Sequence, residues 1–523
     1  MSHTPALAAM RTHLTRVPTD QTTPRTSTVK VPVYLHISAD LLTPVSAYLQ
    51  LVRGQTGPSF LFESVAGGEK IGRFSILGAR PAKTLRVGDL NDGQSTDPLR
   101  VVEQELDTVV VVPVSGAHTV TGGAVGYIGY DCVRFFEPKT APKTPLLDPL
   151  GIPDAIFMFC DTLVVFDHLY QRIQIVTHFN CPYTPANGTD ASLNMSDVEI
   201  EAEYARATAE IDAVVKLLTH PQHPEASFLP FQKPITSLGS ESVSNTGQAK
   251  YEGFVTKLKE YILSGDIIQA VPSQRVTKRT DLHPFNAYRK LRSINPSPYM
   301  FYMDLEQFQL VGASPEMLVK VQDRVVYTHP IAGTRKRGAT QELDDALAQD
   351  LLSDLKERSE HVMLVDLGRN DVNRVCDPST VNVDSLMHIE RYSHVMHIVS
   401  HVSGVLRKDK TMFDAFRSIF PAGTVSGAPK IRAMQIIGEL EGEKRGTYAG
   451  SVGYWSYSQN MDTSIAIRTM IFKDGHVHCQ AGAGIVYDSV PLTEWEETVS
   501  KLMGNVKAVE DAEREQLALQ QKA

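Results

Sequence analysis

The chain has 523 residues, which is long for one ordinary domain and indicates two lobes or one large catalytic unit. Hydrophobic residues make up 42% and charged residues 21% of it, a balance that predicts a sizeable buried core and argues against global disorder. The formal net charge of −9 argues against nucleic acid or an anionic membrane as the main partner, although it leaves room for a local basic pocket that binds an acidic substrate.

Cysteine usage and the N-terminal residues bear on the compartment. The five cysteines lie far apart and form no C-x-x-C pair, which argues against a disulfide framework or a zinc ribbon and favours a reducing, cytoplasmic setting. Residues 1–29 are rich in Thr and Arg and nearly free of acid, like an organelle transit peptide, but they show no clear amphipathic arginine face. We expect a flexible cytosolic tail there, with organellar targeting as the open alternative. No run of 18 apolar residues occurs, so we expect no membrane span.

Apolar periodicity outlines the secondary structure in chain order. Short apolar runs bounded by turn formers are typical of strands, whereas apolar residues three or four apart are typical of helices. Gly265 and Gly442 follow helical patterns and are expected to end them, and Ser426 is the expected N-cap of the later helix. These patterns predict strands at 33–37, 60–63 and 163–166, helices at 198–218 and 254–265, a strand at 266–271, helices at 347–368 and 431–440, and strands at 464–472 and 476–480.

Composition shifts indicate where the chain divides. Residues 183–196 carry turn formers and little apolar content, which is typical of a loop. The stretch 219–246 is rich in Pro, Ser, Gly and His and is typical of a linker. We therefore expect an N-terminal region at 30–240, a catalytic region at 245–510 and a C-terminal tail at 511–523.

One short segment recurs. Residues 123–130 and 450–457 are identical at five of eight positions. The echo marks either two related strands or convergent strand composition, and no longer repeat decides between them.

Two pairs of acidic residues have the spacing that places both side chains on one helix face. Glu357 and Glu360 are three residues apart, and so are Glu494 and Glu497. Four carboxylates from two helices would make an oxygen-rich site suited to Mg²⁺. The same spacing is very common on solvated helices, so spacing alone leaves a metal site and a solvated surface both open.

Three glycine-rich turns, at residues 329–335, 421–430 and 480–485, hold few charges. Glycine lets backbone N–H groups approach an anion closely, and Thr334 and Thr424 would add hydroxyl donors. None of the turns matches a P-loop or a dinucleotide-binding motif, so a nucleotide site is poorly supported. A tight structural turn is the alternative for each.

Two further side chains are candidates for chemistry. If the segment around Arg468 is a strand, alternation places this side chain on the face opposite Ile465 and Ile467, where its guanidinium would hold a carboxylate. An exposed strand arginine is the alternative. His397 is a candidate acid or base, and a structural histidine in an apolar segment is its alternative.

Six segments, read in order, carry a family resemblance. They are residues 265–275, 295–301, 312–316, 329–334, 360–366 and 421–430. The similarity is dense from about 251 to 501 and weaker from 33 to about 166. Together these segments resemble the chorismate-utilising enzymes, and within them the large subunits of anthranilate synthases.

The resemblance implies an α+β fold of two large antiparallel β-sheets packed together and flanked by helices, with the active site in the C-terminal part. It implies a lyase that converts chorismate and ammonia to anthranilate and pyruvate through an aminodeoxyisochorismate intermediate, the first step of tryptophan synthesis. The alternatives are an aminodeoxychorismate synthase and a non-catalytic tryptophan-sensing homologue.

The resemblance also assigns roles to single residues. Glu316 resembles the general acid that protonates the departing C4 hydroxyl, a role that needs a carboxyl kept protonated near neutral pH. His397 resembles the residue tied to the elimination step. The implied Mg²⁺ ligands are Glu360 and Glu497, with Glu357 and Glu494 close by through water. The other implied catalytic and substrate contacts are Gln269, Gly333, Thr334, Thr424, Tyr448, Arg468, Gly482, Ala483, Gly484 and Lys501.

Two positions narrow the implied chemistry. Family members that add water carry Lys where this chain has Gln269, because water needs a base and ammonia does not. The para-amino branch carries Lys where this chain has Ala332, because that lysine attacks C2 itself. Gln269 with Ala332 is the anthranilate pattern.

The segment 61–64 resembles the feedback motif of the family. The resemblance implies an L-tryptophan site that is separate from the chorismate site, as allosteric linkage requires; a buried strand end is the alternative. The implied inhibitor residues are Glu63, Ser64, Lys70, Pro298, Tyr299, Met300 and Tyr454.

The cysteines bear on the ammonia source as well. None lies in a glycine-flanked nucleophile setting like that of glutamine amidotransferases. We therefore expect the chain to use free ammonia and to depend on a separate glutamine amidotransferase subunit when glutamine is the nitrogen source.

Overall fold

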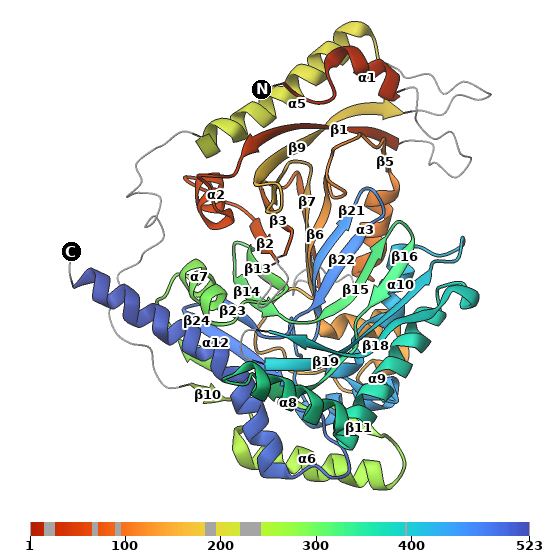
Figure 1. Ribbon diagram of the computed structural model, residues 1–523, viewed down its shortest axis with the longest axis vertical. Coiled ribbons are helices and arrows are strands. Elements are labelled where there is room, and N and C mark those ends of the chain that lie inside the picture. Colours follow the sequence, from red (N-terminus) through yellow and green to blue (C-terminus); the bar gives the residue numbers. More distant parts are fainter. Residues whose placement is uncertain are drawn as a thin grey trace.

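Two large β-sheets lie at the centre of the structure (Figure 1). The computed structural model describes residues 2–14, 27–64, 72–88, 96–183, 195–219, 242–392 and 395–521. The first sheet contains, in spatial order, β10 (Val243–Ser244), β12 (Ser273–Arg279), β24 (His476–Gly482), β23 (Thr469–Lys473), β14 (Gln309–Ser314), β13 (Tyr299–Asp304), β2 (Ser59–Glu63), β3 (Phe74–Ala79), β8 (Leu163–Asp167), β9 (Arg172–Tyr183), β1 (Ser27–Ser38) and β5 (Val109–Val111). The second contains β17 (Ile331–Lys336), β19 (Val395–Val405), β16 (Val325–Thr328), β15 (Met317–Gln322), β22 (Met461–Ile465), β21 (Ser451–Ser456), β6 (Gly123–Ile128), β7 (Ala155–Cys160) and β4 (Lys83–Val87), and β18 (Asn382–Arg391) also pairs with β19.

Strand direction confirms the predicted fold class. Within the described residues, neighbouring strands of both sheets run antiparallel, except that β1 and β5 run parallel. The short strands β11 (Gln269–Ala270) and β20 (Gly427–Ala428) form a separate antiparallel pair. The molecule is therefore an α+β fold of two large, mostly antiparallel sheets.

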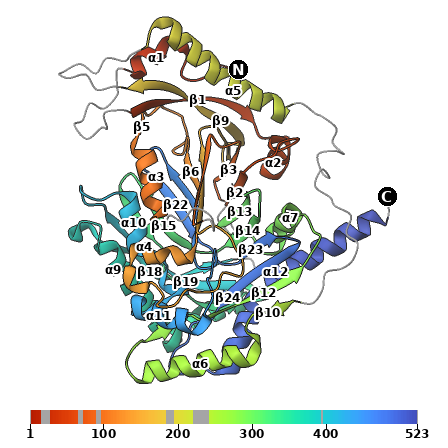
Figure 2. The ribbon, with the colours of Figure 1, turned by 180° about the vertical axis from the view of Figure 1, so that it is seen from behind.

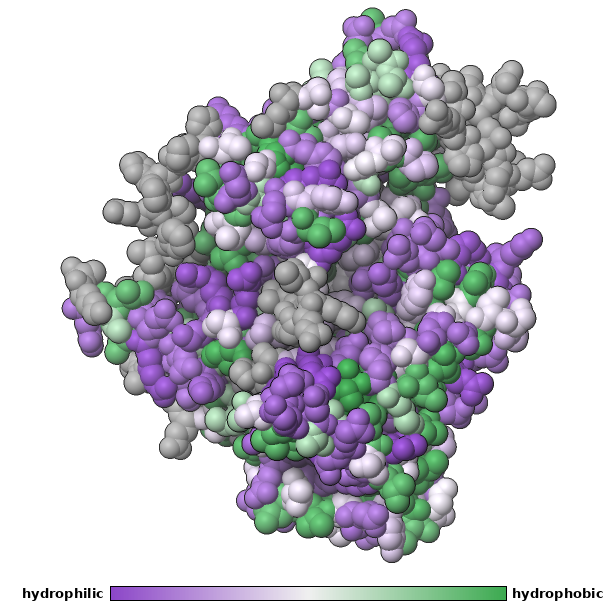
Figure 3. Space-filling view, in the orientation of Figure 1, coloured by the Kyte–Doolittle hydropathy of each residue, from purple (hydrophilic) through white to green (hydrophobic). Residues whose placement is uncertain are grey.

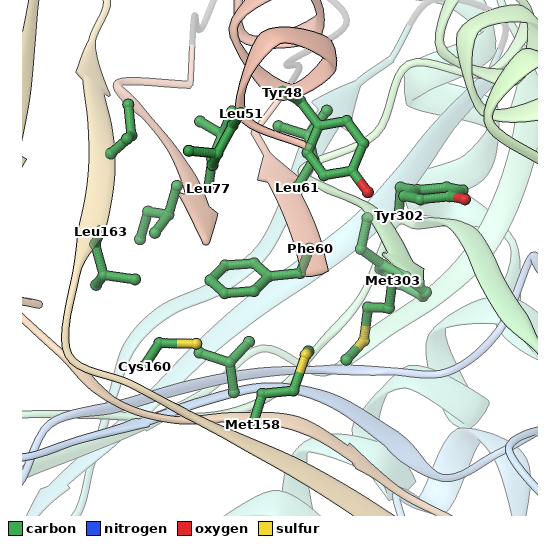
Figure 4. Close-up of a cluster of buried hydrophobic side chains, with 14 of the residues drawn as sticks. Tyr48, Leu51, Phe60, Leu61, Leu77, Met158, Cys160, Leu163, Tyr302 and Met303 are labelled. Carbon is green, nitrogen blue, oxygen red and sulfur yellow. The ribbon is translucent and has the colours of Figure 1, made fainter. Parts of the chain in front are cut away.

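Alternation along β7 explains why the two sheets pack face to face. Successive side chains of a strand point to opposite faces. Met158 and Cys160 point toward the first sheet and lie near Phe60 and Met303 (Figure 4), whereas Phe157 belongs to the core on the other face. Full burial of one such side chain stabilises the fold by about 1.5–3 kcal/mol.

Helices cover the outer faces of the sheets. The first sheet is covered by α2 (Pro44–Leu51), α5 (Asp197–Thr219), α7 (Pro284–Ile294) and α12 (Pro491–Gln520), and the second by α3 (Pro98–Asp107), α9 (Leu355–Asn373) and α10 (Met412–Ile419). The other helices are α1 (Leu7–Leu14), α4 (Val133–Phe136), α6 (Gly247–Leu263), α8 (Gln341–Ser353) and α11 (Lys430–Glu441), of which α4 and α11 are seen best from behind (Figure 2).

The outer surface is mixed. Hydrophilic residues cover most of the face in Figure 3, with hydrophobic residues in small groups between them. None of the helices in the described part of the chain has the combination of length and apolar character that a bilayer span requires.

The predicted terminal tails are wrong where the structure describes them. Within the tail predicted at 1–29, Met10 and Leu14 of α1 are buried in the main core, and β1 already begins at Ser27. Within the tail predicted at 511–523, α12 continues to Gln520, and Glu513 is almost completely buried and accepts a hydrogen bond from Thr280 Oγ1. Both terminal helices pack against residues that are distant in the sequence, and the local residue pattern does not indicate these contacts.

The predicted division into regions at 30–240 and 245–510 does not separate two folding units. Strand β2 lies between β3 and β13, and β6 lies between β7 and β21, so both sheets contain strands from each region. Most of the predicted linker at 219–246 and of the predicted loop at 183–196 lies outside the described residues.

The echo between residues 123–130 and 450–457 corresponds to two neighbouring strands. β6 and β21 pair antiparallel, with Gly126 opposite Gly453. A side chain at either glycine would collide with the backbone of the next strand, at Ile156 and Asp462 respectively. The shared glycines therefore permit the same close approach twice.

Other predicted elements differ in detail. The helix predicted at 347–368 is two helices that meet at Asp354, which accepts hydrogen bonds from the backbone N–H groups of Lys356 and Glu357 and so starts α9. The strand predicted at 266–271 shrinks to the two residues of β11. Gly442 ends α11 in the left-handed region at φ 70°, as predicted, but Pro429 rather than Ser426 precedes the helix.

Candidate active site

Glu316 is a carboxyl that burial keeps protonated. It lies between β14 and β15 and is 8% exposed. Burial raises the pKa of Glu316 to about 8, although a hydrogen bond from Thr424 Oγ1 at 2.9 Å and the charge of Lys501 favour the ionised form. A carboxyl with this pKa holds a proton at neutral pH and can give it away, which fits the predicted general acid.

Two helices supply the acidic residues predicted to bind Mg²⁺. Glu357 and Glu360 come from α9, and Glu494 and Glu497 from the first turns of α12. Burial raises the pKa of Glu360, and the charges of Glu357 and Glu497 raise it further. Burial also raises the pKa of Glu494, again with a contribution from Glu497. Carboxylates whose charges influence one another lie in one neighbourhood, and their hard oxygens are the ligand type that Mg²⁺ prefers.

Gln269 connects β11 to this carboxylate group. Its Nε2 donates to Glu360 Oε1 across 3.0 Å. Its Oε1 is buried and accepts no hydrogen bond from any described residue. A Cβ at position 484 would lie 2.5 Å from Gln269 Nε2, so Gly484 leaves the space that this side chain occupies.

A basic group lies beside the acidic one. Lys501 Nζ forms an ion pair with Glu497 at 2.6 Å and donates to the carbonyl of Gly482 at 2.9 Å. Arg468 Nη1 donates to the carbonyl of Lys501 at 2.8 Å. Burial raises the pKa of Tyr448 to about 12, so this phenol, which approaches Gly482, remains a donor. Two cations and a phenol suit a substrate that carries carboxylates.

The strand predicted across Arg468 is wrong. β22 ends at Ile465 and β23 begins at Thr469, and Arg468 between them has φ 52°. The direction of the Arg468 side chain therefore follows from this left-handed backbone conformation and not from the alternation of a strand.

His397 lies on β19 and contacts the predicted glycine turn. Its Nδ1 lies 2.9 Å from the carbonyl oxygen of Gly333 and 3.2 Å from Thr334 Oγ1. A carbonyl can only accept, so Nδ1 carries the proton and Nε2 keeps a free lone pair. Burial lowers the pKa of His397, which favours the neutral base. The turn predicted at 329–335 is mostly strand β17, whose pairing with β19 shifts register after Ala332, and Gly333 has φ 70°. Ala332 is 9% exposed and pairs with Ile398 on β19.

Charge interactions connect several of these groups in pairs. The charge of Lys501 lowers the pKa of Glu316, and the charge of Glu497 raises the pKa of Glu360. The charge of Arg468 lowers the pKa of His397. Figure 1 shows α9, α12 and β19 together in the lower half of the molecule. Ala483 is the exception among the predicted contacts, because its N–H donates to Tyr251 Oη at 3.3 Å and is engaged within the protein.

A separate cavity of about 1070 Å³ is lined by strands of both sheets. All the predicted inhibitor residues that the structure describes line it, and Lys70 lies outside the described residues. Tyr299 Oη donates to Asp462 Oδ1 at 3.0 Å, and Met300 pairs with Glu63 across β13 and β2. Glu63 itself accepts from Tyr288 Oη and Arg292 Nε. The predicted inhibitor residues, from distant segments, therefore share one cavity.

Several residues in or near these sites are not predicted by the sequence patterns. Arg445 is 1% exposed and donates to the carbonyls of Val271 and Val425, which supports the turn that holds Thr424. Tyr392 lies edge-on to His397 with ring centroids 5.6 Å apart. A cluster of His388, Glu390 and His401 also lies near the cavity wall. The spacing of His388 and Glu390, two apart on a strand, is the one hint that a pattern search would find.

Comparisons with known proteins agree with this arrangement. The family model described as chorismate binding enzyme matches residues 57–506. The chain is 52% identical over 486 residues to "Probable anthranilate synthase component 1" of Schizosaccharomyces pombe, covering 93% of this chain and 94% of that one. It is 50% identical over 489 residues to "Anthranilate synthase component 1" of Saccharomyces cerevisiae, covering 92% of each. The crystal structure of anthranilate synthase component I from Streptococcus pneumoniae superposes with a TM-score of 0.70 at 36% identity, covering 90% of this chain and 98% of that one. The chain therefore belongs to the chorismate-binding enzymes, and within them to the anthranilate synthase component 1 family.

Proposed function

We propose that this chain converts chorismate and ammonia to anthranilate and pyruvate. The observation that carries the proposal is Glu316, a buried carboxyl with a pKa of about 8 beside Thr424 and Lys501. Glu316 gives its proton to the C4 hydroxyl, which leaves as water while ammonia adds at C2. A C2 proton and the enolpyruvyl group then leave, and the ring becomes aromatic.

Gln269 supports ammonia as the nucleophile. Because its Nε2 is held by Glu360, its buried Oε1 remains available to accept a hydrogen bond from an incoming N–H. A neutral amide cannot serve as a base for water, and ammonia needs no such base. Ala332 supports the ortho product, because a methyl group at this position offers no amine that could attack C2.

His397 supports the elimination step. Its Nδ1–H is fixed by the Gly333 carbonyl, so the neutral Nε2 is the atom that can accept or relay a proton. Its role here is to hold or move the proton that leaves C2.

Mg²⁺ is the proposed cofactor. Glu360 and Glu497 would hold it, with Glu357 and Glu494 nearby through water, and the ion would neutralise and orient the ring carboxylate of chorismate. The ion pair of Lys501 with Glu497 shows that this carboxylate already has a cation beside it. Arg468 and Lys501 would bind the remaining negative charge of the substrate.

We further propose that the cavity around Ser64 and Met300 binds L-tryptophan as a feedback inhibitor. Pro298, Tyr299 and Tyr454 provide apolar and aromatic surface for an indole ring, and Asp462 provides an acceptor for an ammonium group. The same cavity reaches Pro315 and Ile331, the neighbours of Glu316 and Ala332, so an inhibitor there would act close to the reacting groups.

A separate glutamine amidotransferase subunit is the proposed ammonia donor. All five cysteines are buried. Burial raises the pKa of the thiols of Cys181 and Cys376 to about 11 and of Cys479 to about 12. A glutaminase nucleophile needs the opposite, an accessible thiol with a lowered pKa.

Anthranilate fluorescence tests these proposals together. The purified chain with chorismate, Mg²⁺ and ammonium should produce the signal, EDTA should abolish it and tryptophan should suppress it. With glutamine in place of ammonium, the chain should give no fluorescence signal unless the amidotransferase subunit is added. Consumption of chorismate without anthranilate would reject the proposed product, and no consumption at all would favour a non-catalytic sensor.

A further inference from the structure

A group of three imidazoles and one carboxylate lies outside the proposed catalytic residues. His388 and Glu390 stand on β18, and His401 stands on β19 beside it. One ligand atom from each of these three side chains lies within 4.8 Å of the others. The ring of His329 stacks on that of His401, with centroids 4.0 Å apart and planes at 16°.

The strand register places the three ligand side chains on one face. Glu390 pairs with His397, and His388 pairs with Val399. Paired residues share one face of the sheet, and so does every second residue along a strand, so this face also carries His401, two residues after Val399. The cluster therefore lies on the face that also carries His397.

The hydrogen bonds turn the metal-binding atoms toward one another. Ser385 Oγ lies 2.9 Å from His388 Nδ1, and His388 Nε2 forms a hydrogen bond with Glu390 Oε1 at 3.3 Å, a contact that a cation between the two atoms would replace. Tyr392 Oη donates to Glu390 Oε2 at 2.9 Å, so Oε1 is the carboxylate oxygen that faces the imidazoles. His401 Nε2 is buried, lies 3.9 Å from Glu390 Oε1 and has no hydrogen-bond partner among the described residues.

We propose that His388, Glu390 and His401 form a second metal site, which takes Zn²⁺ or a similar transition cation. Zn–N and Zn–O bonds of about 2.0–2.2 Å require neighbouring ligand atoms about 3.3–3.6 Å apart in a tetrahedron. The 3.3 Å separation of His388 Nε2 from Glu390 Oε1 already fits. The 3.9 Å separation of His401 Nε2 from Glu390 Oε1, and the separation of the two imidazoles within the 4.8 Å bound, would close by side-chain rotation. His388 and Glu390 line the large cavity, so a water molecule can complete the coordination from that side.

The ligand chemistry separates this site from the carboxylate site. Imidazole nitrogens favour Zn²⁺, Co²⁺ and Ni²⁺, whereas Mg²⁺ favours the all-oxygen set of Glu360 and Glu497. Ser385 and Tyr392 orient the ligands as outer partners commonly do in metal sites. His329 holds the plane of His401 by stacking, and Lys320 and Glu390 are charged groups that act on His329.

Zn²⁺ titration of the full-length chain without a histidine tag tests the proposal, with Mg²⁺ in large excess to occupy the carboxylate site. Calorimetry should show one tight Zn²⁺ equivalent in the unaltered chain. His401→Phe, which keeps the stacking surface for His329, and His388→Asn should each weaken that site by more than about 100-fold, because even outer partners of metal ligands cost 10–100-fold. His36→Phe is the matched control, since His36 lines the same cavity but stands on β1.

Two further readouts keep the test independent of variant folding. Co²⁺ in place of Zn²⁺ should give the strong visible absorption of a nitrogen-ligated, low-coordinate ion in the unaltered chain and in His36→Phe, and lose it in Glu390→Gln. Zn²⁺ should raise the melting temperature of the same two proteins and leave that of His401→Phe unchanged. Absence of a tight Zn²⁺ equivalent in the unaltered chain, or equal affinity in all the variants, would overturn the proposal.

Discussion

Gln269 Nε2 donates to Glu360 Oε1 across 3.0 Å, although the two residues are 91 positions apart in the chain. This bond turns the amide so that its carbonyl oxygen is buried without a partner among the described residues. A buried acceptor without a donor is costly, at about 1–3 kcal/mol, and a small donor molecule such as ammonia would satisfy it.

Gln269→Leu should raise the KM for ammonia by about tenfold, the equivalent of one lost hydrogen bond of about 1.4 kcal/mol. The KM for chorismate at saturating Mg²⁺ serves as the internal control, because the substitution leaves Arg468 and Lys501 in place. Steady-state anthranilate fluorescence at varied ammonium gives both constants. An equal rise in the two KM values would show that Gln269 supports the site generally and does not position ammonia.

Glu316→Gln should lower kcat/KM by about 10²–10⁴, the usual contribution of a general acid. Since the acid form of Glu316 is required and its pKa is about 8, the rate per free NH₃ should be level below pH 8 and fall about tenfold per pH unit above it. Glu316→Asp is the matched control, because it keeps a titrating carboxyl and should keep an alkaline limb. Persistence of that limb in Glu316→Gln would assign it to another group.

Ala332→Lys should remove most anthranilate output. Ala332 is almost completely buried on β17 next to Gly333, whose carbonyl contacts His397, so an amine there would lie close to the substrate ring and compete with ammonia. Ala332→Met is the control for added volume, because the methionine side chain is similar in length to that of lysine but has no amine. Product analysis by chromatography decides the outcome: unchanged anthranilate in Ala332→Lys would show that position 332 does not select the product, and equal losses in both variants would show that bulk alone is responsible.

Ser64→Phe should leave turnover within about twofold and raise the tryptophan concentration for half inhibition by at least about tenfold, since filling a pocket removes contacts worth more than about 1.4 kcal/mol. Ser64 lines the cavity against Gly72, so a ring at position 64 has to occupy the space of the inhibitor. Ser64→Ala should change inhibition much less. Inhibition curves at fixed chorismate measure the effect, and equal sensitivity of Ser64→Phe and the unaltered chain would place the inhibitor elsewhere.

The residues at helical spacing show what could be read from local pattern. Glu357 with Glu360 and Glu494 with Glu497 fall on α9 and α12 as their spacing predicts, because a helix has the same period wherever it lies. Strands such as β2 and β8 followed from apolar runs, and Gly442 ends α11 because glycine alone takes a left-handed φ at no cost.

The sequence by itself thus determined α5, α6 and α11, strands such as β1, β2, β8 and β24, the family segments and the residue types available for acid, base and metal chemistry. Only the tertiary structure decided which of them meet. Burial from distant segments raises the pKa of Glu316, and strand pairing brings Glu63 to Met300 and Glu390 to His397. A turn with φ 52° at Arg468 replaces a predicted strand. The burial of Glu316 and the pairing of Glu63 with Met300 depend on residues more than a hundred positions away, so no local pattern encodes them.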